Sequence, residues 1–467
     1  MKIVIVGAGK VGVALTRHLA VENRVTVIDQ NPHLVENIIN IYDVMGVCGN
    51  GASYDVQKEA DVEQADLLIA TTSSDEINIL TCLVAKKMGV QHTIARIRSP
   101  EYGRQLRFMR SELGLSMAIN PEAATAREIA RVLRFPTAMK LESFSKGRLE
   151  LVEYRVAEHT ALDGTRLSEL YRNFKVRVLI CAVARQGETI IPSGDFTLRA
   201  GDKIYLTAAP RELEKFFRLL GVFRARASSV MIVGASKMCY YLASELLEMG
   251  MSVKIIDQNE QRCVEMSEKL PRALVIVGDG TDSELLSEEG ISQTDAFVAI
   301  TGLDEANILM ALSAAKQSGD CCKVVAKINR KSLLELVSTE SLIDSVVSTG
   351  AVTTELILQY IRAMKNASAS KVKTLHRIVD EKVEALRLLC LRHCPEDMDF
   401  SVTPDISFAG VPLRDLNLKR GLLLAGIVRQ NGQIVIPSGN DVLHLHDDVI
   451  VVTTDTQLED LRDILAE

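Results

Sequence analysis

The chain has 467 residues, of which 47% are hydrophobic, 25% are charged and 4% are aromatic, and it contains no tryptophan. This composition excludes a largely disordered chain, and the length predicts about two to four domains, each with its own core. The 54 basic and 61 acidic residues leave a formal net charge of −7. That charge opposes a broad phosphate-binding face, so we expect no nucleic-acid partner.

The first part of the chain alternates strands with helices. Strands are predicted at Lys2–Val6, Val25–Ile28 and Leu67–Thr71, and a helix is predicted from about Val11 to Ala20. The strands are apolar on both faces, as buried parallel strands are. The alternation therefore predicts a doubly wound parallel sheet.

A smaller domain with a different pattern follows. Asn120-Pro121-Glu122 and an amphipathic helix through Leu133, stopped by Pro136, connect it to the parallel sheet. The segments beyond this helix are typical of an antiparallel sheet. They are Glu150–Val156, Val176–Ala184, Gly187–Pro192 and Lys203–Thr207.

Both parts then recur in the second half of the chain. Ile5–Lys10 returns with one substitution as Ile232–Lys237, and Ile28–Asn31 returns unchanged as Ile256–Asn259. Internal repeats of this kind define the architecture. We expect an α/β fold with two Rossmann-like doubly wound domains, each followed by a small α+β domain. The predicted domains are 1–137, 138–225, 226–368 and 369–467, with a polar linker at 224–229 between the halves.

The repeat also sets the expected elements of the second half. Strands are predicted at Val230–Val233, Val253–Ile256 and Ala296–Thr301, with a helix ending near Met249 and a connecting helix from about Gly350 to Met364.

The apolar runs are all short of the roughly 18 to 20 residues that a membrane-spanning helix needs. The predicted strand Lys2–Val6 begins directly after Met1, with no signal-peptide pattern ahead of it, so a cytosolic location is expected. The nine cysteines are an odd number in mostly apolar surroundings, which favours reduced thiols. The tightest Cys and His groups, Cys321-Cys322 and Cys390 with His393 and Cys394, lack a matching second pair, so no metal site is expected.

A glycine-rich loop follows the first strand and opens the first helix. Its residues are Gly7, Ala8, Gly9, Lys10, Val11 and Gly12. In this context Gly7 permits a tight turn, Gly9 lets the backbone approach a pyrophosphate, and Gly12 lets the helix pack against the strand. The amides and the positive end of the helix dipole would face the phosphates.

An acidic residue ends the second strand. Asp29 lies where a carboxylate can accept hydrogen bonds from both ribose hydroxyls. Gln30 and Asn31 follow it, and no arginine is present there to pair with a 2′-phosphate, so NAD is favoured over NADP.

The second copy departs from this pattern. Gly234 and Asp257 remain, but Ser236 replaces Gly9 and Cys239 replaces Gly12. A side chain at Ser236 would crowd a pyrophosphate. Binding in this half is expected to be weaker, altered towards a mononucleotide, or lost.

Other candidate residues follow the later strands. Thr72 and Ser73 should face the same crevice as the glycine loop, with Asp75 as the N-cap of a helix. Arg96 is expected to bring positive charge to a phosphate, whereas Arg98 fits that role and a solvated position equally well. Lys327 and Asn329 stand at these two positions in the second half, which weakens a charge-based site there.

No catalytic constellation accompanies the loop. The chain lacks H-E-x-x-H and G-x-S-x-G motifs, its histidines are scattered, and His444 and His446 read as surface residues. Asp75-Glu76 and Asp304-Glu305 each begin a helix, where acidic charge complements the dipole. A nucleotide site without reacting groups favours sensing over catalysis.

Taken together, these stretches resemble the RCK/KTN family, the cytoplasmic regulatory subunits of Trk-type bacterial potassium uptake systems. The resemblance covers nearly the whole chain. It is carried by Lys2 to Gly12, Val27 to Asp29, Thr72 to Glu76 with Asn78, Ala95 to Tyr102, and Leu198 to Asp202.

The resemblance implies a non-catalytic subunit that binds NAD(H) or adenine nucleotides such as ATP or ADP. It further implies a homo-oligomeric ring, a dimer of dimers or tetramer, under an integral-membrane potassium-translocating partner at the inner face of the plasma membrane. The implied first pocket is Gly7 to Val11, Asp29, Thr72, Ser73 and Arg96. The implied second pocket is Gly234, Ala235, Ser236, Lys237, Met238 and Asp257.

Two alternatives remain open at this point. A cytosolic NAD-dependent oxidoreductase would need catalytic groups that the sequence does not display. A redox-sensing transcription regulator would need a basic helix-turn-helix, which neither the acidic balance nor any segment supports.

Overall fold

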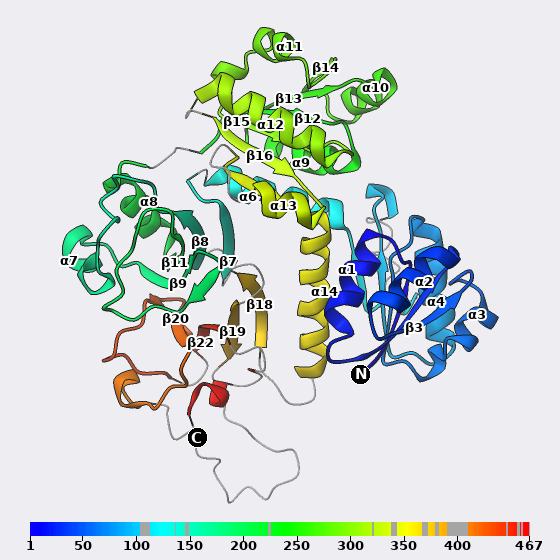
Figure 1. Ribbon diagram of the computed structural model, residues 1–467, viewed down its shortest axis with the longest axis horizontal. Helices are drawn as coiled ribbons and strands as arrows, with labels where there is room; N and C mark the ends of the chain where they lie inside the picture. The colour runs from blue at the N-terminus through cyan, green and yellow to red at the C-terminus, as the bar shows by residue number, and fades with distance from the viewer. Residues whose placement is uncertain are drawn as a thin grey trace, which may run out of the picture. The chain divides into compact units, whose positions relative to one another are not determined.

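The computed structural model describes residues 1–102, 113–135, 137–144, 149–222, 226–319, 322–337, 343–366, 372–378, 383–389, 410–444, 447–454, 458 and 461–466. The chain forms two compact units, one from Met1–Leu133 with Ala227–Leu356 and the other from Arg134–Arg226 with Ile357–Glu467. The first unit holds two six-stranded parallel sheets and the second holds two five-stranded sheets (Figure 1). The predicted fold class and the internal repeat are therefore confirmed.

The first parallel sheet has the strand order β3-β2-β1-β4-β5-β6. Its strands are β1 (Lys2–Val6), β2 (Arg24–Asp29), β3 (Met45–Cys48), β4 (Leu67–Ala70), β5 (His92–Arg96) and β6 (Met117–Ile119). Helices α1 (Lys10–Leu19), α2 (Pro32–Ile41), α3 (Tyr54–Glu59) and α4 (Asp75–Lys87) connect them. Figure 1 shows α1 and α3 on opposite sides of this sheet.

The register aligns the carboxyl ends of the central strands. Val6 of β1 lies opposite Ile28 of β2 on one side and Ala70 of β4 on the other, and Ala70 lies opposite Ala95 of β5. The chain order reverses between β2 and β4, which makes β1 the switch point where a crevice opens. The residues that follow these strands therefore meet at one edge of the sheet.

The strands are held by burial on both faces. Ile3, Val4 and Ile5 have no exposed surface, and each such side chain contributes roughly 1.5–3 kcal/mol when removed from water. This explains why the sequence shows continuous apolar runs here rather than alternation.

The second parallel sheet repeats the first with the order β14-β13-β12-β15-β16-β17. Its strands are β12 (Ser229–Val233), β13 (Ser252–Asp257), β14 (Leu274–Val277), β15 (Ala296–Ala299), β16 (Lys323–Lys327) and β17 (Ser345–Val347). Its helices are α9 (Lys237–Glu248), α10 (Glu260–Lys269), α11 (Ser283–Glu288), α12 (Asp304–Ser318) and α13 (Lys331–Val337). A further helix, α14 (Thr349–Asn366), follows β17.

Helix α6 (Pro121–Arg134) leaves the first parallel domain and joins the core of the second. Its buried residues Ala126, Ile129 and Ala130 belong to one apolar cluster with Leu242 and Leu246 of α9. The sequence predicted this helix as a connector. Its packing makes it a shared element of both parallel domains.

The second unit contains two antiparallel sheets, with the orders β10-β9-β11-β8-β7 and β18-β19-β22-β20-β21. The first consists of β7 (Lys140–Phe144), β8 (Leu149–Arg155), β9 (Leu179–Arg185), β10 (Glu188–Ile190) and β11 (Lys203–Ala208), with helices α7 (Leu170–Phe174) and α8 (Pro210–Leu219). The second consists of β18 (Val372–Ile378), β19 (Val383–Leu389), β20 (Leu422–Val428), β21 (Ile434–Val435) and β22 (Asp448–Thr453). One buried cluster contains residues of both sheets, including Leu149, Tyr205, Val383 and Ile450. Within the described ranges, no helix combines the length and the apolar character needed to cross a bilayer.

Candidate nucleotide-binding site

The backbone geometry of the first loop requires glycine at two positions. Gly7 has φ +105°, and a Cβ there would lie 2.9 Å from the backbone of Thr71 and Thr72. A Cβ on Gly12 would lie 1.8 Å from the carbonyl oxygen of Gly7. By contrast, no atom lies within 4 Å of a Cβ built on Gly9, so the fold itself does not require glycine there.

The loop presents donors at the start of α1. Gly9 is the N-cap and has no capping side chain, and no acidic residue lies in the first turn. Val13 N donates to Gly9 O, whereas the amides of Gly9 and Gly12 make no hydrogen bond with the described part of the chain. Free amides at the positive end of a helix dipole bind anions.

Asp29 lies at the carboxyl end of β2 and adjoins this loop. Its Oδ2 accepts a hydrogen bond of 2.6 Å from Ala8 N, and its Oδ1 accepts one of 2.9 Å from Asn31 N. These bonds hold the carboxylate beside the glycine turn. Each oxygen can accept further hydrogen bonds, which suits a pair of ribose hydroxyls.

Thr72 and Ser73 follow β4 at the same edge of the sheet. Thr72 N and Oγ1 both donate to Asn78 Oδ1, each at 2.8 Å, so Thr72 is fixed by a neighbour. Asn78 Nδ2 also donates to Thr72 O and to Arg96 O, at 3.2 and 2.9 Å. Fully buried Asn78 thus ties β4 to β5, a role that sequence reasoning did not assign.

The expectation that Asp75 is a helix N-cap is wrong. Ser74 is the N-cap of α4, and its side chain accepts a hydrogen bond from Ile77 N. Asp75 is the first helical residue, and its carboxylate accepts from Arg98 N and Ser99 N at 2.8–3.0 Å. It fixes the loop after β5 rather than only complementing the helix dipole.

Arg96 and Arg98 converge on one carboxylate. Glu122 Oε1 is 3.3 Å from Arg96 Nη2 and 2.7 Å from Arg98 Nε, and Glu122 is 6% exposed. Arg98 is therefore ion-paired, not simply solvated. Arg96 Nε and Glu122 Oε2 are buried without a hydrogen-bond partner, and burial lowers the pKa of Arg96 below its usual range.

The second copy keeps the scaffold of this site. Gly234 has φ +112°, and Asp257 accepts from Ala235 N at 2.7 Å and from Asn259 N at 2.8 Å. Asn307 repeats the Asn78 network by bonding Thr301 and Lys327 O.

The charges of the second copy differ from those of the first. Lys327 replaces Arg96, and its ammonium donates to Ile300 O at 3.4 Å. Burial lowers the pKa of Lys327, and Asp304 opposes that shift. Arg330 pairs with Glu305 and Asp304. These pairings leave less positive charge for a phosphate.

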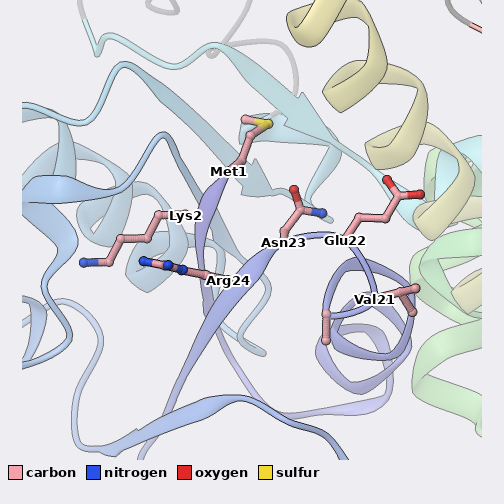
Figure 2. Close-up of a pocket in the computed structure, with 7 residues that line it drawn as sticks. Met1, Lys2, Val21, Glu22, Asn23 and Arg24 are labelled. Carbon is pink, nitrogen blue, oxygen red and sulfur yellow. The ribbon is translucent and has the colours of Figure 1, made fainter. Parts of the chain in front are cut away.

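A separate hollow lies at the opposite edge of the first sheet. Figure 2 shows it at the amino ends of β1 and β2. Its lining is Met1, Lys2, Ala20, Val21, Glu22, Asn23 and Arg24. Because the glycine loop follows the carboxyl end of β1, this hollow is not the predicted crevice.

Candidate metal ligands are not gathered by the described part of the chain, which holds no group of three or more His, Cys, Asp or Glu side chains suited to a metal. Cys321, Cys390, His393, Cys394 and His446 lie outside the described residues. The predicted linker is described only from Arg226 onward. His444 is exposed, as expected.

Comparison with known proteins places this geometry in a family. The TrkA-N domain model matches residues 3–121 and 230–349, and the TrkA-C domain model matches residues 151–221 and 398–466. The chain belongs to the TrkA family. The resemblance to the RCK/KTN regulatory subunits is thereby confirmed.

Relatives of similar length exist in archaea and bacteria. The chain is 30% identical over 465 residues to a Trk system potassium uptake protein TrkA homolog of Archaeoglobus fulgidus, covering 99% of this chain and 100% of that one. It is 32% identical over 460 residues to the Trk system potassium uptake protein TrkA of Vibrio alginolyticus, covering 97% and 94%. A solved structure described as the GsuK channel bound to NAD shares the fold, with a TM-score of 0.61, 20% identity, and coverage of 98% of this chain and 77% of that one.

Proposed function

We propose that this TrkA-family chain is a non-catalytic regulatory subunit that senses an adenine nucleotide and gates a membrane potassium-translocating partner. The single observation that carries the proposal is the first loop, whose free amides lie beside Asp29 and share a sheet edge with Arg96. This combination offers donors to a pyrophosphate and an acceptor to a ribose.

The ligand is NAD(H), with ATP or ADP as the other adenine nucleotides that the same site would accept. Asp29 favours an unmodified ribose, because its carboxylate would repel a 2′-phosphate. The next two residues are Gln30 and Asn31, so no arginine follows Asp29 to pair with such a phosphate. The related channel described as bound to NAD supports the same choice.

Binding is transmitted through Glu122. Ligand phosphates compete with its carboxylate for Arg96 and Arg98, and charge-assisted bonds of this kind are the strong ones. Glu122 lies in the first turn of α6, whose later turns are packed in the second parallel domain. Displacing Glu122 therefore moves an element that both domains share, and a ligand that favours one arrangement shifts the population towards it.

The working assembly is a cytoplasmic homo-oligomer, a dimer of dimers or tetramer, held at the inner face of the plasma membrane by its membrane partner. The homologues named as Trk system potassium uptake proteins support the link to potassium transport. The alternative, an NAD-dependent oxidoreductase, would turn over nicotinamide rather than change affinity for a partner.

The decisive experiment combines binding with transport. We expect NAD or NADH to raise the unfolding temperature of the full chain, and Asp29→Ala to abolish this effect. Asp257→Ala is the matched control, because Asp257 makes the same backbone contacts in the second copy. Potassium flux through the co-purified membrane partner should then depend on nucleotide. Absence of any nucleotide-dependent shift, or steady nicotinamide turnover, would refute the proposal.

A further inference from the structure

The second glycine loop lacks the glycine that packs its helix against its strand. Cys239 occupies the position of Gly12, and it is fully buried. In the first domain, a Cβ at Gly12 would lie 1.8 Å from Gly7 O, far inside any real contact. The second loop must therefore place the carbonyl of Gly234 elsewhere.

The hydrogen bonds of the second loop show where the carbonyl of Gly234 points. Gly234 O accepts a hydrogen bond of 3.0 Å from Ser236 N, within the loop itself. The corresponding amide of the first loop, on Gly9, makes no such bond to any described residue. In addition, Cys239 N donates to the hydroxyl of Ser236 at 3.4 Å, whereas Gly12 N has no such cap. Two amides that are free in the first loop are satisfied internally in the second.

From this difference we infer that Cys239 closes the second loop to a pyrophosphate, so that each chain binds a single dinucleotide, in the first parallel domain. The inference rests on the proposed function of the first loop. A pyrophosphate at a helix N-terminus needs backbone amides that point outward and lack other partners. In the second loop the ligand would have to break the Ser236–Gly234 bond and displace the Ser236 cap.

The Cβ atom of Cys239, not the Ser236 side chain, displaces the Gly234 carbonyl, whereas the Ser236 hydroxyl adds only a long hydrogen bond of 3.4 Å. At the equivalent position in the first loop, no atom lies within 4 Å of a Cβ built on Gly9, so the fold itself tolerates a side chain there. The backbone scaffold of the second pocket is kept, since Asp257 and Asn307 make the contacts of their counterparts, and Lys327 retains one positive charge at the position of Arg96. A single substitution that removes the Cβ of Cys239 should therefore open the site.

The test is the stoichiometry of nucleotide binding to the full chain, measured by isothermal titration with NAD and, separately, with ADP. We expect one site per wild-type chain, two sites in Cys239→Gly, and one again when Asp257→Ala is added. Cys239→Ala is the matched control, because it removes the thiol but keeps the Cβ, and it should retain one site.

Several results would overturn the inference. One is a wild-type chain with two sites, of which Asp257→Ala loses one. Another is a Cys239→Ala variant with two sites. The third is a second site that appears when Ser236→Gly is the only substitution. If circular dichroism shows that Cys239→Gly does not fold, Gly12→Ala in the first loop is tested instead. We expect this variant to lose the nucleotide site of the first loop, and retained binding would refute the inference. A wild-type chain that binds no nucleotide would instead refute the proposed function.

Discussion

Asn78→Ala tests the link between the strand ends and the pocket. The side chain makes four hydrogen bonds of 2.8 to 3.2 Å to Thr72 and Arg96, both predicted pocket residues. Its removal leaves three backbone groups, Thr72 N, Thr72 O and Arg96 O, without these partners. Each orphaned buried group costs about 1–3 kcal/mol and Thr72 is only partly buried, so we expect the free energy of unfolding to fall by roughly 2–6 kcal/mol.

The assay is thermal and urea unfolding of the full chain, followed by titration with NAD. At about 2–4 °C per kcal/mol for a unit of this size, the unfolding temperature should fall by roughly 5–20 °C. Affinity for NAD should fall by about tenfold or more, because a misplacement of Thr72 and Arg96 of about 1 Å weakens every bond they direct.

Asn307→Ala supplies an internal control for the same perturbation. Asn307 makes the equivalent bonds to Thr301 and Lys327, so the loss of stability should be similar. Its effect on NAD affinity should be negligible, since the second loop is closed. A loss of less than about 1 kcal/mol of stability in Asn78→Ala, or equal weakening of NAD binding in both variants, would contradict this role of Asn78.

Three further variants probe the charges. Glu122→Gln should lower the unfolding temperature without nucleotide and increase the stabilisation that NAD provides, because Arg96 and Arg98 lose their anionic partner; equal losses with and without NAD would contradict this. Lys327→Met should remove a pH dependence of stability. Burial lowers the folded pKa of Lys327 below 10.5, so the free energy of unfolding of the wild-type chain rises as pH increases from that lowered pKa towards 10.5. Below the lowered pKa, the full cost of burying the charged ammonium is present. In urea unfolding from pH 8 to 10.5, the free energy of unfolding of the wild-type chain should rise relative to that of the variant. Parallel pH dependences of the two would contradict this. Arg185→Ala should cost about 3–5 kcal/mol in urea unfolding, since it strands the buried carboxylate of Asp202, whereas a cost under about 1 kcal/mol would show a solvent-screened pair.

The elements that the sequence predicted well are those set by local pattern. β1 was predicted at its observed bounds, and the strands β2, β4, β12 and β13 within a residue or two, because buried parallel strands are continuous apolar runs. Strand β7 was missed: its residues Lys140–Phe144 mix charged and apolar side chains, and only pairing with β8 makes them a strand. Pairing depends on a second segment, so the periodicity of one segment alone does not reveal it.

The same division applies to the site. The glycine loop and Asp29 are recognisable because their spacing is local and its physical reasons are general. Asn78 and Glu122 could not be assigned their roles, because each acts on residues that are distant along the chain and meet only at the strand ends. The N-cap of α4 was predicted one residue too late, because Ser74 and Asp75 both suit that position. Only the folded loop places the amides of Arg98 and Ser99 where they donate to Asp75.

The two copies separate what the fold needs from what the ligand needs. Asp257, Thr301 and Asn307 retain the backbone contacts of their first-domain counterparts, so these contacts belong to the scaffold that the two domains share. The copies differ where helix meets strand, at Gly12 and Cys239, and the difference redirects one carbonyl. The second domain also forms an interface with the first: its helix α9 packs on α6, and Tyr241 of α9 donates to Arg98 O. These contacts are the route by which the proposed nucleotide signal would reach the second domain.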